Sequence, residues 1–304
     1  MNIITNWVKI KQMKEAHLYQ KFKDKAVKCQ NCAHYCTVLP DKRGICGVRE
    51  NINGEFYALN YGKLVACQID PIEKKPLYHF LSGTYSLSIA AAGCNFACLN
   101  CQNWQISQNP KPQKSVAGEN VEPKEIVEMA LKNNLPSISY TYTEPAIFSE
   151  YALDIMKIAR QNGLKNVWVT NGFWSKELFD TVSPYLDAVN VDLKSFEENF
   201  YKKICQGRLE PVLDTLKGLK KKNIWIEITT LVLPGLNDQE KTFKDIAGFI
   251  KKELGSETPW HVSRFFQDVS WRLKDLPDTS TETIKKACRI GKEAGLKNVY
   301  AGNM

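Results

Sequence analysis

Residues 85–101 decide the fold, and they read Tyr-Ser-Leu-Ser-Ile-Ala-Ala-Ala-Gly-Cys-Asn-Phe-Ala-Cys-Leu-Asn-Cys. The first eight residues are mostly apolar or small, which predicts a buried strand over 85–92 in a parallel sheet. Cys94, Cys98 and Cys101 follow that strand within one short loop. In an α/β barrel, the loops at the carboxyl ends of the strands carry the active site. The spacing therefore predicts a functional centre built on three thiols.

From residue 85 onward, short apolar strands alternate with amphipathic helices, which predicts parallel strands joined by helical crossovers. Strands are expected at 85–92, 137–143, 166–171, 188–193, 224–233, 260–265 and 298–302. Helices are expected at 123–133, 145–162, 175–185, 211–222, 239–254 and 280–294. Thr279 and Glu282 have the spacing of a capping box for the last helix. We therefore predict an α/β fold over residues 85–304, a partial (β/α)6-type TIM barrel.

Residues 1–84 differ from the rest, and we expect them to form a small Cys-rich N-terminal domain. A turn signal at 82–83 marks its boundary, and the Asn- and Gly-containing stretch 51–62 suggests a hairpin within it.

Four soft ligands lie within this N-terminal segment, at Cys29, Cys32, Cys36 and Cys46. Four thiolates suit either a structural zinc ion or a second, fully ligated iron–sulfur cluster that relays electrons. The spacing does not choose between them, and an unmetallated Cys-rich turn is the third interpretation. Of the three we favour the iron–sulfur cluster.

Composition limits the alternatives. Ten unevenly clustered cysteines in 304 residues favour metal ligation over a disulfide scaffold. Cys67, Cys205 and Cys288 are isolated, and we expect them to be small buried hydrophobes without a further role. The net charge of +8 comes from Lys pairs spread along the chain, so no nucleic-acid partner is expected. An acidic electron donor or protein substrate fits this charge at least as well.

No segment is long and apolar enough to suggest a membrane span. The apolar runs at 87–93 and 224–233 are interrupted by polar residues and fall short of the about 20 residues that a bilayer requires. The first 25 residues lack the apolar core of a signal peptide. We therefore expect a cytoplasmic protein without a membrane partner.

The three clustered thiols are one too few for an ordinary iron–sulfur cluster. A cubane normally takes four thiolates, so Cys94, Cys98 and Cys101 would leave one iron open to another ligand. The alternative is a zinc knuckle with a distant fourth ligand, but structural zinc prefers paired C-x2-4-C units.

The spacing C-x3-C-x2-C after a strand resembles the signature of the radical S-adenosylmethionine (SAM) superfamily. The resemblance implies that Cys94, Cys98 and Cys101 hold a [4Fe-4S] cluster whose open iron binds SAM. It also implies that a reduced flavodoxin- or ferredoxin-like donor supplies an electron for reductive SAM cleavage. The expected products are methionine and a 5′-deoxyadenosyl radical, which abstracts hydrogen from a substrate.

Other positions across 85–265 resemble more narrowly the glycyl-radical-enzyme activases, such as the pyruvate formate-lyase activating enzyme. The segment 142–145, Tyr-Thr-Glu-Pro, stands where that subgroup has Gly-Gly-Glu-Pro, which implies that Glu144 contacts the SAM amino group. The alternative is that Glu144 only favours the N-terminus of the following helix. Thr170 and Asn171, followed by Gly, resemble the subgroup's Asp-Thr-Asn-Gly. Val169 replaces the Asp, which puts a cation site there in doubt.

Two further positions carry the same resemblance. Asp192 and Lys194 match an Asp-Leu-Lys in which both charged side chains reach SAM, although an ion pair at a strand end is the alternative. His261 stands where the family has a His near SAM, and its alternative is a satisfied core residue. Because these positions fall near the same ends of successive strands, we expect them to meet at one barrel mouth.

The Cys-rich start, with the segments 70–77 and 259–265, makes the whole chain resemble the radical SAM enzyme of the AmmeMemoRadiSam system. This resemblance does not supply the substrate. Activase-like formation of a glycyl radical on a partner protein is the favoured function. Radical modification of a small molecule, a lipid or another protein residue is the alternative, and a zinc-stabilised nucleic-acid-binding module is a distant third.

Overall fold

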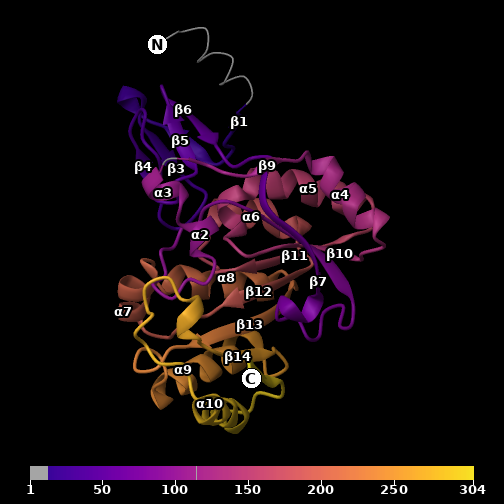
Figure 1. The fold of residues 1–304 in the computed structure, drawn as a ribbon, viewed down its shortest axis with the longest axis vertical. Helices are drawn as coiled ribbons and strands as arrows, with labels where there is room; N and C mark the ends of the chain where they lie inside the picture. The colour runs from indigo at the N-terminus through magenta and orange to yellow at the C-terminus, as the bar shows by residue number, and fades with distance from the viewer. Residues whose placement is uncertain (1–12, 114) are drawn as a thin grey trace.

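The structure is a computed structural model that describes residues 13–113 and 115–304. Within these residues the main sheet is nine-stranded, in the order β15-β14-β13-β12-β11-β10-β8-β7-β9. Its two edge strands, β15 and β9, do not pair with each other, so the sheet curves without closing (Figure 1).

Parallel strands form the body of this sheet, and each pairs with the one that precedes it in the chain. They are β8 (Tyr85–Ala91), β10 (Ser137–Tyr140), β11 (Lys165–Thr170), β12 (Ala188–Asp192), β13 (Trp225–Val232), β14 (Trp260–Arg264) and β15 (Val299–Gly302). Their bounds agree closely with the expected strands. The predicted partial barrel of parallel strands is confirmed.

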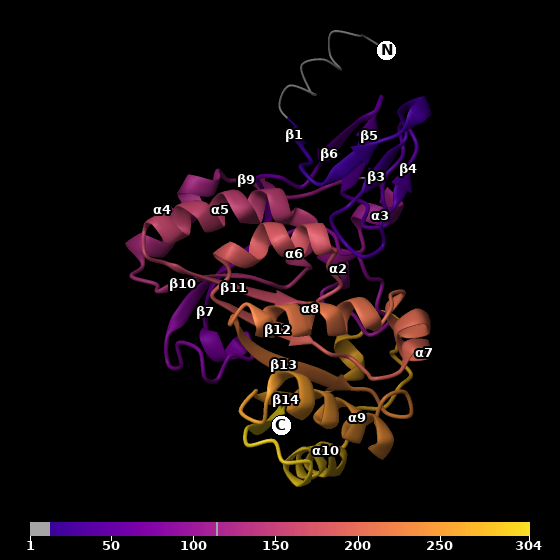
Figure 2. The same cartoon turned by 180° about the vertical axis from the view of Figure 1, so that it is seen from behind.

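Helices cover the outer face of the sheet, as Figures 1 and 2 show from opposite sides. The longer ones are α4 (Pro123–Lys132), α5 (Ser149–Gln161), α6 (Lys176–Val182), α8 (Glu210–Lys221), α9 (Glu240–Phe249) and α10 (Thr281–Glu293). The short ones are α2 (Trp104–Ser107), α3 (Pro110–Gln113) and α7 (Glu198–Phe200). Each longer helix turns an apolar stripe to the sheet, which is the pattern that the sequence predicted.

The N-cap of α10 lies one residue later than the sequence predicted. Ser280, not Thr279, is the N-cap of α10, and its hydroxyl accepts from the backbone N–H of Thr283. Thr279 is fully buried, and its hydroxyl donates to the carbonyl of Val232 at 2.6 Å. Its side chain is therefore engaged with the neighbouring strand and is not free to cap the helix.

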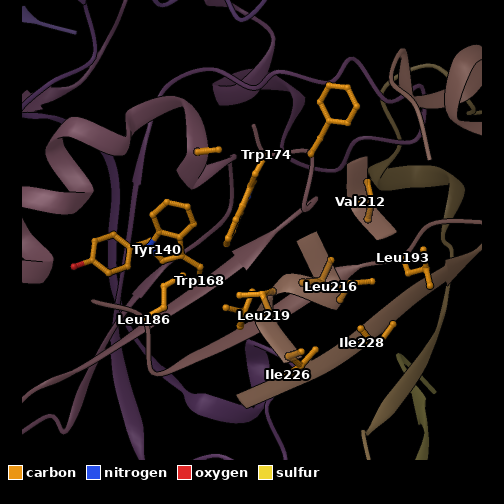
Figure 3. Close-up of a cluster of buried hydrophobic side chains, with 14 of the residues drawn as sticks. Tyr140, Trp168, Trp174, Leu186, Leu193, Val212, Leu216, Leu219, Ile226 and Ile228 are labelled. Carbon is orange, nitrogen blue, oxygen red and sulfur yellow. The ribbon is translucent and has the colours of Figure 1, made fainter. Parts of the chain in front are cut away.

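The core lies between the helices and the sheet. Figure 3 shows Leu216 and Leu219 of α8 against Ile226 and Ile228 of β13, with Trp168 of β11 beside them. All are buried, and truncating one such aromatic side chain costs about 3–5 kcal/mol of stability. This packing fixes the strands whose carboxyl ends carry the polar residues described below.

The N-terminal region contains two small antiparallel sheets at one end of the molecule (Figure 1). One sheet has the order β1-β6-β5 and the other the order β2-β3-β4. The bounds of these strands are Lys14–Glu15 (β1), Tyr19–Lys21 (β2), Val27–Cys29 (β3), Thr37–Val38 (β4), Arg49–Ile52 (β5) and Glu55–Ala58 (β6). The hairpin expected from the Asn- and Gly-rich stretch is β5–β6, and Asn53 and Gly54 turn it with positive φ angles of 55° and 96°.

The main sheet begins earlier in the chain than residue 85. Strand β7 (Lys63–Pro71) pairs antiparallel with β8 along most of its length, and β9 (Glu119–Asn120) pairs with its other edge. The last part of the expected N-terminal domain therefore belongs structurally to the main sheet. A polar-rich strand such as Cys67-Gln68-Ile69-Asp70 lacks the apolar run by which the parallel strands are recognised.

Candidate functional site

A cleft of about 480 Å³ lies at the carboxyl ends of the parallel strands, within the size range of small-molecule sites. Cys94, Cys98 and Cys101 all line it. Backbone hydrogen bonds hold their loop: Ala97 N–H donates to the carbonyl of Cys205 at 3.0 Å, and Cys101 N–H donates to the carbonyl of Cys98 at 3.0 Å. These backbone hydrogen bonds therefore fix the conformation of the loop.

Gly93 allows the chain to leave β8 in the direction of the cleft. Its φ is +105°, a conformation that L side chains rarely adopt. A Cβ at this position would lie 2.8 Å from Cγ1 of Val48 and 3.2 Å from the carbonyl oxygen of Cys46. The thiol loop thus packs directly against the Cys-rich N-terminal region.

The donors around the thiols suit a bound metal cluster. The N–H of Phe96 donates to Sγ of Cys94 at 3.4 Å, and the Asn171 amide lies 3.9 Å from the same sulfur. Such donors stabilise a thiolate, which is the form that binds metal. In residues 13–113 and 115–304, no three His, Cys, Asp or Glu side chains converge closely enough to hold a single metal ion. Three thiolates with these hydrogen-bond donors fit a cubane that keeps one iron open to another ligand.

Without a metal, these thiols would hold their protons. Burial raises the pKa of Cys94 well above its usual range, and burial likewise raises the pKa of Cys101. A hydrogen bond with the Cys205 thiol, together with burial, raises the pKa of Cys98. Metal ligation replaces these protons, so cluster assembly releases them to solvent.

Glu144 is the most constrained polar side chain of the cleft and is 1% exposed. One oxygen accepts from the Thr170 hydroxyl at 2.7 Å and from the N–H of Ala146 at 3.0 Å. The other oxygen accepts from the N–H of Asn171 at 2.8 Å. Glu144 therefore both caps the short turn at 145–148 and lines the cleft, so the two expectations for it are compatible.

Burial dominates the acidity of this carboxyl. It raises the pKa of Glu144 to about 7, because the three hydrogen bonds to the carboxylate offset only part of the desolvation. A cationic group entering the cleft would favour the ionised form.

Asn171 links the ends of β11 and β8. Its amide donates to Oδ1 of Asn95 at 2.7 Å, and its own Oδ1 accepts from the N–H of Phe173 at 2.9 Å. Thr170 accepts from Trp174 Nε1 at 3.0 Å while it donates to Glu144. Thr170 and Asn171 thus meet the cysteine loop at the cleft.

Asp192 and Lys194 form an ion pair of 2.7 Å at the end of β12, and both line the cleft. Burial alone would lower the pKa of Lys194, but Asp192 and the neighbouring thiols raise it well above the usual range. Lys194 therefore carries a positive charge a short distance from Cys98. The pair can meet an ammonium and a carboxylate from the same ligand.

His261 does not line the cleft. Its Nε2 lies 2.7 Å from the carboxylate of Glu227, and its ring packs between Tyr78 and Tyr300. It belongs to the same face of β14 as Ser263, which does line the cleft, but it lies two residues nearer the amino end. The structure thus places His261 one layer below the barrel mouth, in the environment of a satisfied core residue.

A second, smaller cavity is lined by Cys29, Cys32, Cys36 and Cys46, which do not line the cleft. Arg49 and Asn95 also line that cavity.

Tyr142 is a feature of the cleft that sequence reasoning missed. Its φ is +63°, its hydroxyl donates to Asp70, and the Nζ of Lys75 lies 4.4 Å from its ring centroid. The available signal was the Gly-Gly-Glu-Pro segment of the activases, because a Gly at this position indicates a left-handed backbone. In this chain a Tyr keeps that conformation and gains polar partners.

Cys205 is buried, as the sequence predicted, but its contact with the cysteine loop was not foreseen. Isolated in sequence, it nevertheless hydrogen-bonds with Cys98 through its thiol and lies fully buried beside the loop. No spacing rule connects residues so far apart, so no local signal could have found it.

The class of protein follows from the thiols and their position. Three thiols on the loop after the first parallel strand, at the mouth of an open barrel, characterise enzymes that keep one iron of a cluster free for SAM. The chain belongs to the radical SAM superfamily, whose family model matches residues 88–246.

Known relatives agree with this assignment. An uncharacterized protein of Methanocaldococcus jannaschii is 47% identical over 292 residues, which cover 96% of this chain and 86% of that protein. The pyruvate formate-lyase-activating enzyme of Clostridium pasteurianum is 20% identical, over 66% of this chain and 87% of its own length.

Solved structures show the same fold. A radical SAM methyltransferase from Sphaerobacter thermophilus superimposes with a TM-score of 0.56 over 73% of this chain and 67% of its own chain, at 12% identity. In the part of the chain that the structure describes, no helix is long and apolar enough to cross a membrane.

Proposed function

We propose that this radical SAM enzyme is activase-like and forms a glycyl radical on a partner protein, and that it belongs to the AmmeMemoRadiSam subgroup. The convergence of the three thiols, Glu144 and the Asp192–Lys194 pair on one cleft supports SAM binding there. The likeness to the pyruvate formate-lyase-activating enzymes of Clostridium pasteurianum and Escherichia coli supports the activase role.

Cys94, Cys98 and Cys101 would hold the cluster, and the remaining polar residues would orient SAM. A [4Fe-4S] cluster in this position supplies the single electron that cleaves SAM to methionine and a 5′-deoxyadenosyl radical. Glu144 and Asp192 provide carboxylates for the SAM ammonium, and Lys194 provides a positive charge for its carboxylate. His261 is left out of this set because it is bonded to Glu227 below the cleft.

Thr170 and Asn171 line the cleft, where they can contact SAM, and they also position Glu144. Their hydroxyl and backbone N–H fix both carboxylate oxygens, so the acid does not need to reorganise when the ligand arrives. The electron comes from a reduced flavodoxin- or ferredoxin-like protein.

The first test measures SAM cleavage directly. The protein is reconstituted with iron and sulfide without oxygen, reduced with dithionite and given SAM, and 5′-deoxyadenosine is quantified. Cys98→Ala should abolish the product, whereas Cys288→Ala, on the distant helix α10, should retain it.

Lys194→Met should weaken SAM binding by roughly 10- to 100-fold because a charge-assisted contact is lost. The exposed Lys203→Met is its matched control. Full activity of Cys98→Ala would refute the assignment.

A second test addresses the partner. The reduced enzyme is incubated with SAM and a candidate glycyl radical enzyme encoded beside it or in the same cell, and the sample is frozen for electron paramagnetic resonance. A glycyl doublet that depends on SAM and on Cys98 supports the activase role. Consumption of SAM only with a small molecule, a lipid or a different protein side chain would replace that role while leaving the SAM chemistry intact.

A further inference from the structure

A line of hydrogen bonds ends on one of the three cleft thiols. Ser107, the last residue of α2, is 2% exposed, and its hydroxyl lies 3.3 Å from Sγ of Cys101. The same hydroxyl accepts from Nε2 of Gln108 at 3.1 Å. Oε1 of Gln108 in turn accepts from Nζ of Lys111 at 2.8 Å. Lys111, Gln108 and Ser107 are thus connected in sequence to Cys101.

The partners of Gln108 fix the direction of these hydrogen bonds. Nζ of Lys111 can only donate, so the amide atom that faces it is the oxygen. The amide nitrogen therefore faces the other way, where it donates to the Phe96 carbonyl at 3.1 Å and to Ser107. A Cys101 sulfur that ligates a metal carries no proton. The Ser107 hydroxyl, which already accepts from Gln108, is then the donor to that sulfur.

The backbone holds these side chains against the thiol loop. The N–H of Gly93 donates to the carbonyl of Ile106, which precedes Ser107, at 2.9 Å. Nζ of Lys111 also donates to the carbonyl of Phe96, inside the loop, at 2.8 Å. The hydroxyl and the ammonium are therefore positioned by the protein, as groups that support metal ligands usually are.

Both groups favour negative charge on the thiols. Burial raises the pKa of Cys101, and the hydrogen bond with Ser107 acts in the opposite direction. Burial and the charge of Glu144 raise the pKa of Cys94, and the positive charge of Lys111 lowers it. The hydroxyl and the ammonium therefore stabilise the thiolate form of two cysteines of the loop.

Stabilised negative charge changes the reduction potential of an iron–sulfur cluster. An added electron makes the cluster more negative, and hydrogen bonds to the ligating sulfurs stabilise that reduced state. Donors to sulfur therefore raise the potential. A cluster that has such donors is easier for an external electron donor to reduce.

We propose that Ser107 donates a hydrogen bond to the cluster ligand Cys101, that Gln108 and Lys111 orient this hydroxyl, and that the three residues together raise the reduction potential of the [4Fe-4S] cluster. They are positioning residues, because they act through the ligand and transfer no electron or proton themselves. The inference rests on the cluster of the proposed function and is independent of the activase role.

A redox titration tests the proposal without SAM. Wild-type and variant proteins are reconstituted anaerobically, matched for iron content and titrated with dithionite and mediators, while electron paramagnetic resonance follows the signal that Cys98→Ala lacks. Ser107→Ala should make reduction less favourable by roughly three- to tenfold. That change lowers the midpoint potential by about 30–60 mV, because tenfold corresponds to about 59 mV for one electron. A potential equal to that of the wild type would overturn the proposal.

Two further variants separate the hydrogen bond from the loss of a buried hydroxyl. Ser107→Thr keeps a hydroxyl and should restore the wild-type potential. Ser183→Ala, in the short turn Ser183–Tyr185 after α6, removes a buried hydroxyl that has no hydrogen-bond partner among the described residues. It should leave the potential unchanged. Equal shifts in Ser107→Ala and Ser183→Ala, or no recovery in Ser107→Thr, would contradict the role of the hydrogen bond.

Lys111 gives a test that leaves the Ser107 hydroxyl in place. Lys111→Met removes a positive charge and the partner that orients Gln108, so it should also lower the midpoint potential. Lys241→Met is the matched control, because that side chain is 78% exposed on α9, and it should have no effect. If Ser107→Ala does not assemble a cluster, Lys111→Met decides alone, and an unchanged potential there overturns the proposal.

Failure of this proposal is distinguishable from failure of the proposed function. A wild-type protein that assembles no reducible cubane contradicts the proposed function. A reducible cubane whose potential is the same with and without Ser107 and Lys111 contradicts only the role of these residues.

Discussion

At the scale of single residues, Glu144 shows how the cleft prepares for a cation. The side chain is buried, both oxygens are already engaged, and its pKa lies near neutrality. Because its pKa is raised from 4.5 to about 7, this carboxyl destabilises the empty folded protein, and the destabilisation grows as pH rises from 4.5 to 7. An ammonium in the cleft offsets that cost. The residue was recognisable from its sequence context, but its near-neutral pKa depends on burial that only the fold provides.

This acidity leads to a pH dependence of SAM binding. Burial raises the pKa of Glu144 to about 7, so below that pH the carboxyl is protonated and loses its attraction for the SAM ammonium. Affinity should fall roughly tenfold between pH 8 and pH 6. Equilibrium dialysis with SAM under anaerobic conditions measures it. Glu144→Gln should bind SAM weakly and with little pH dependence over this range, and an equally steep profile in that variant would assign the titration to another group.

At the scale of elements, the sequence predicted where the strands lie in the chain. It did not predict how far each strand residue lies from the mouth of the barrel. Apolar runs such as residues 85–91 mark buried parallel strands because both faces are covered. The level at which a residue stands within its strand depends on how neighbouring strands are staggered. His261 is an example: its alternation with Ser263 is visible in the sequence, whereas its position below the cleft beside Glu227 follows from the pairing of β13 with β14. The same limit applies to β7, which lacks a regular apolar pattern and becomes recognisable as a strand only through its pairing with β8.

The joint between β8 and the thiol loop should tolerate no side chain at Gly93. Gly93→Ala places a Cβ 2.8 Å from Val48 on a backbone with φ of +105°. We expect a loss of about 1–3 kcal/mol of stability and reduced iron retention, measured by urea denaturation and iron analysis. Gly163→Ala, with φ of +77° and open space around it, isolates the backbone strain. Gly248→Ala, exposed within α9, should gain up to about 1 kcal/mol. Equal effects at Gly93 and Gly163 would show that contact with Val48 is unimportant.

At the scale of the whole molecule, the N-terminal region is fastened to the barrel by buried polar contacts. Arg49 of β5 meets Glu150 at the start of α5, and Ser149 donates to Asn31 at 2.7 Å. The backbone of Cys32 forms an isolated antiparallel β-bridge with Trp174 in the loop after β11. These contacts join residues more than a hundred positions apart, so local sequence patterns could not reveal them. The sequence predicted an appended Cys-rich segment, but it could not predict that this segment packs beside the thiol loop.

This fastening should make the protein sensitive to acid. Burial alone would raise the pKa of Glu150, but the charge and hydrogen bonds of Arg49 outweigh it and lower the pKa to about 2. The pair therefore contributes stability above the ordinary carboxyl pKa of 4.5, and that contribution is lost as pH falls from 4.5 toward 2. Urea denaturation between pH 7 and pH 3 measures this loss.

A variant separates this pair from general acid effects. Glu150→Gln leaves the Arg49 charge buried and unpaired, and should cost about 3–5 kcal/mol at pH 7 while flattening the acid dependence. Glu128→Gln, in an exposed pair with Lys124, should change stability by less than about 1 kcal/mol. An acid profile of Glu150→Gln as steep as that of the wild type would contradict the role of the pair.

The long separation between these contacts also sets an order of events during synthesis. The four N-terminal cysteines leave the ribosome well before the barrel segments that bury them. Arg49 can pair with Glu150 only after another 101 residues have been synthesised. At about 5–20 residues per second, that interval lasts roughly 5–20 s. During it the thiols are open to oxygen and to foreign metal ions. Expression in air should therefore oxidise these thiols while the protein is being made.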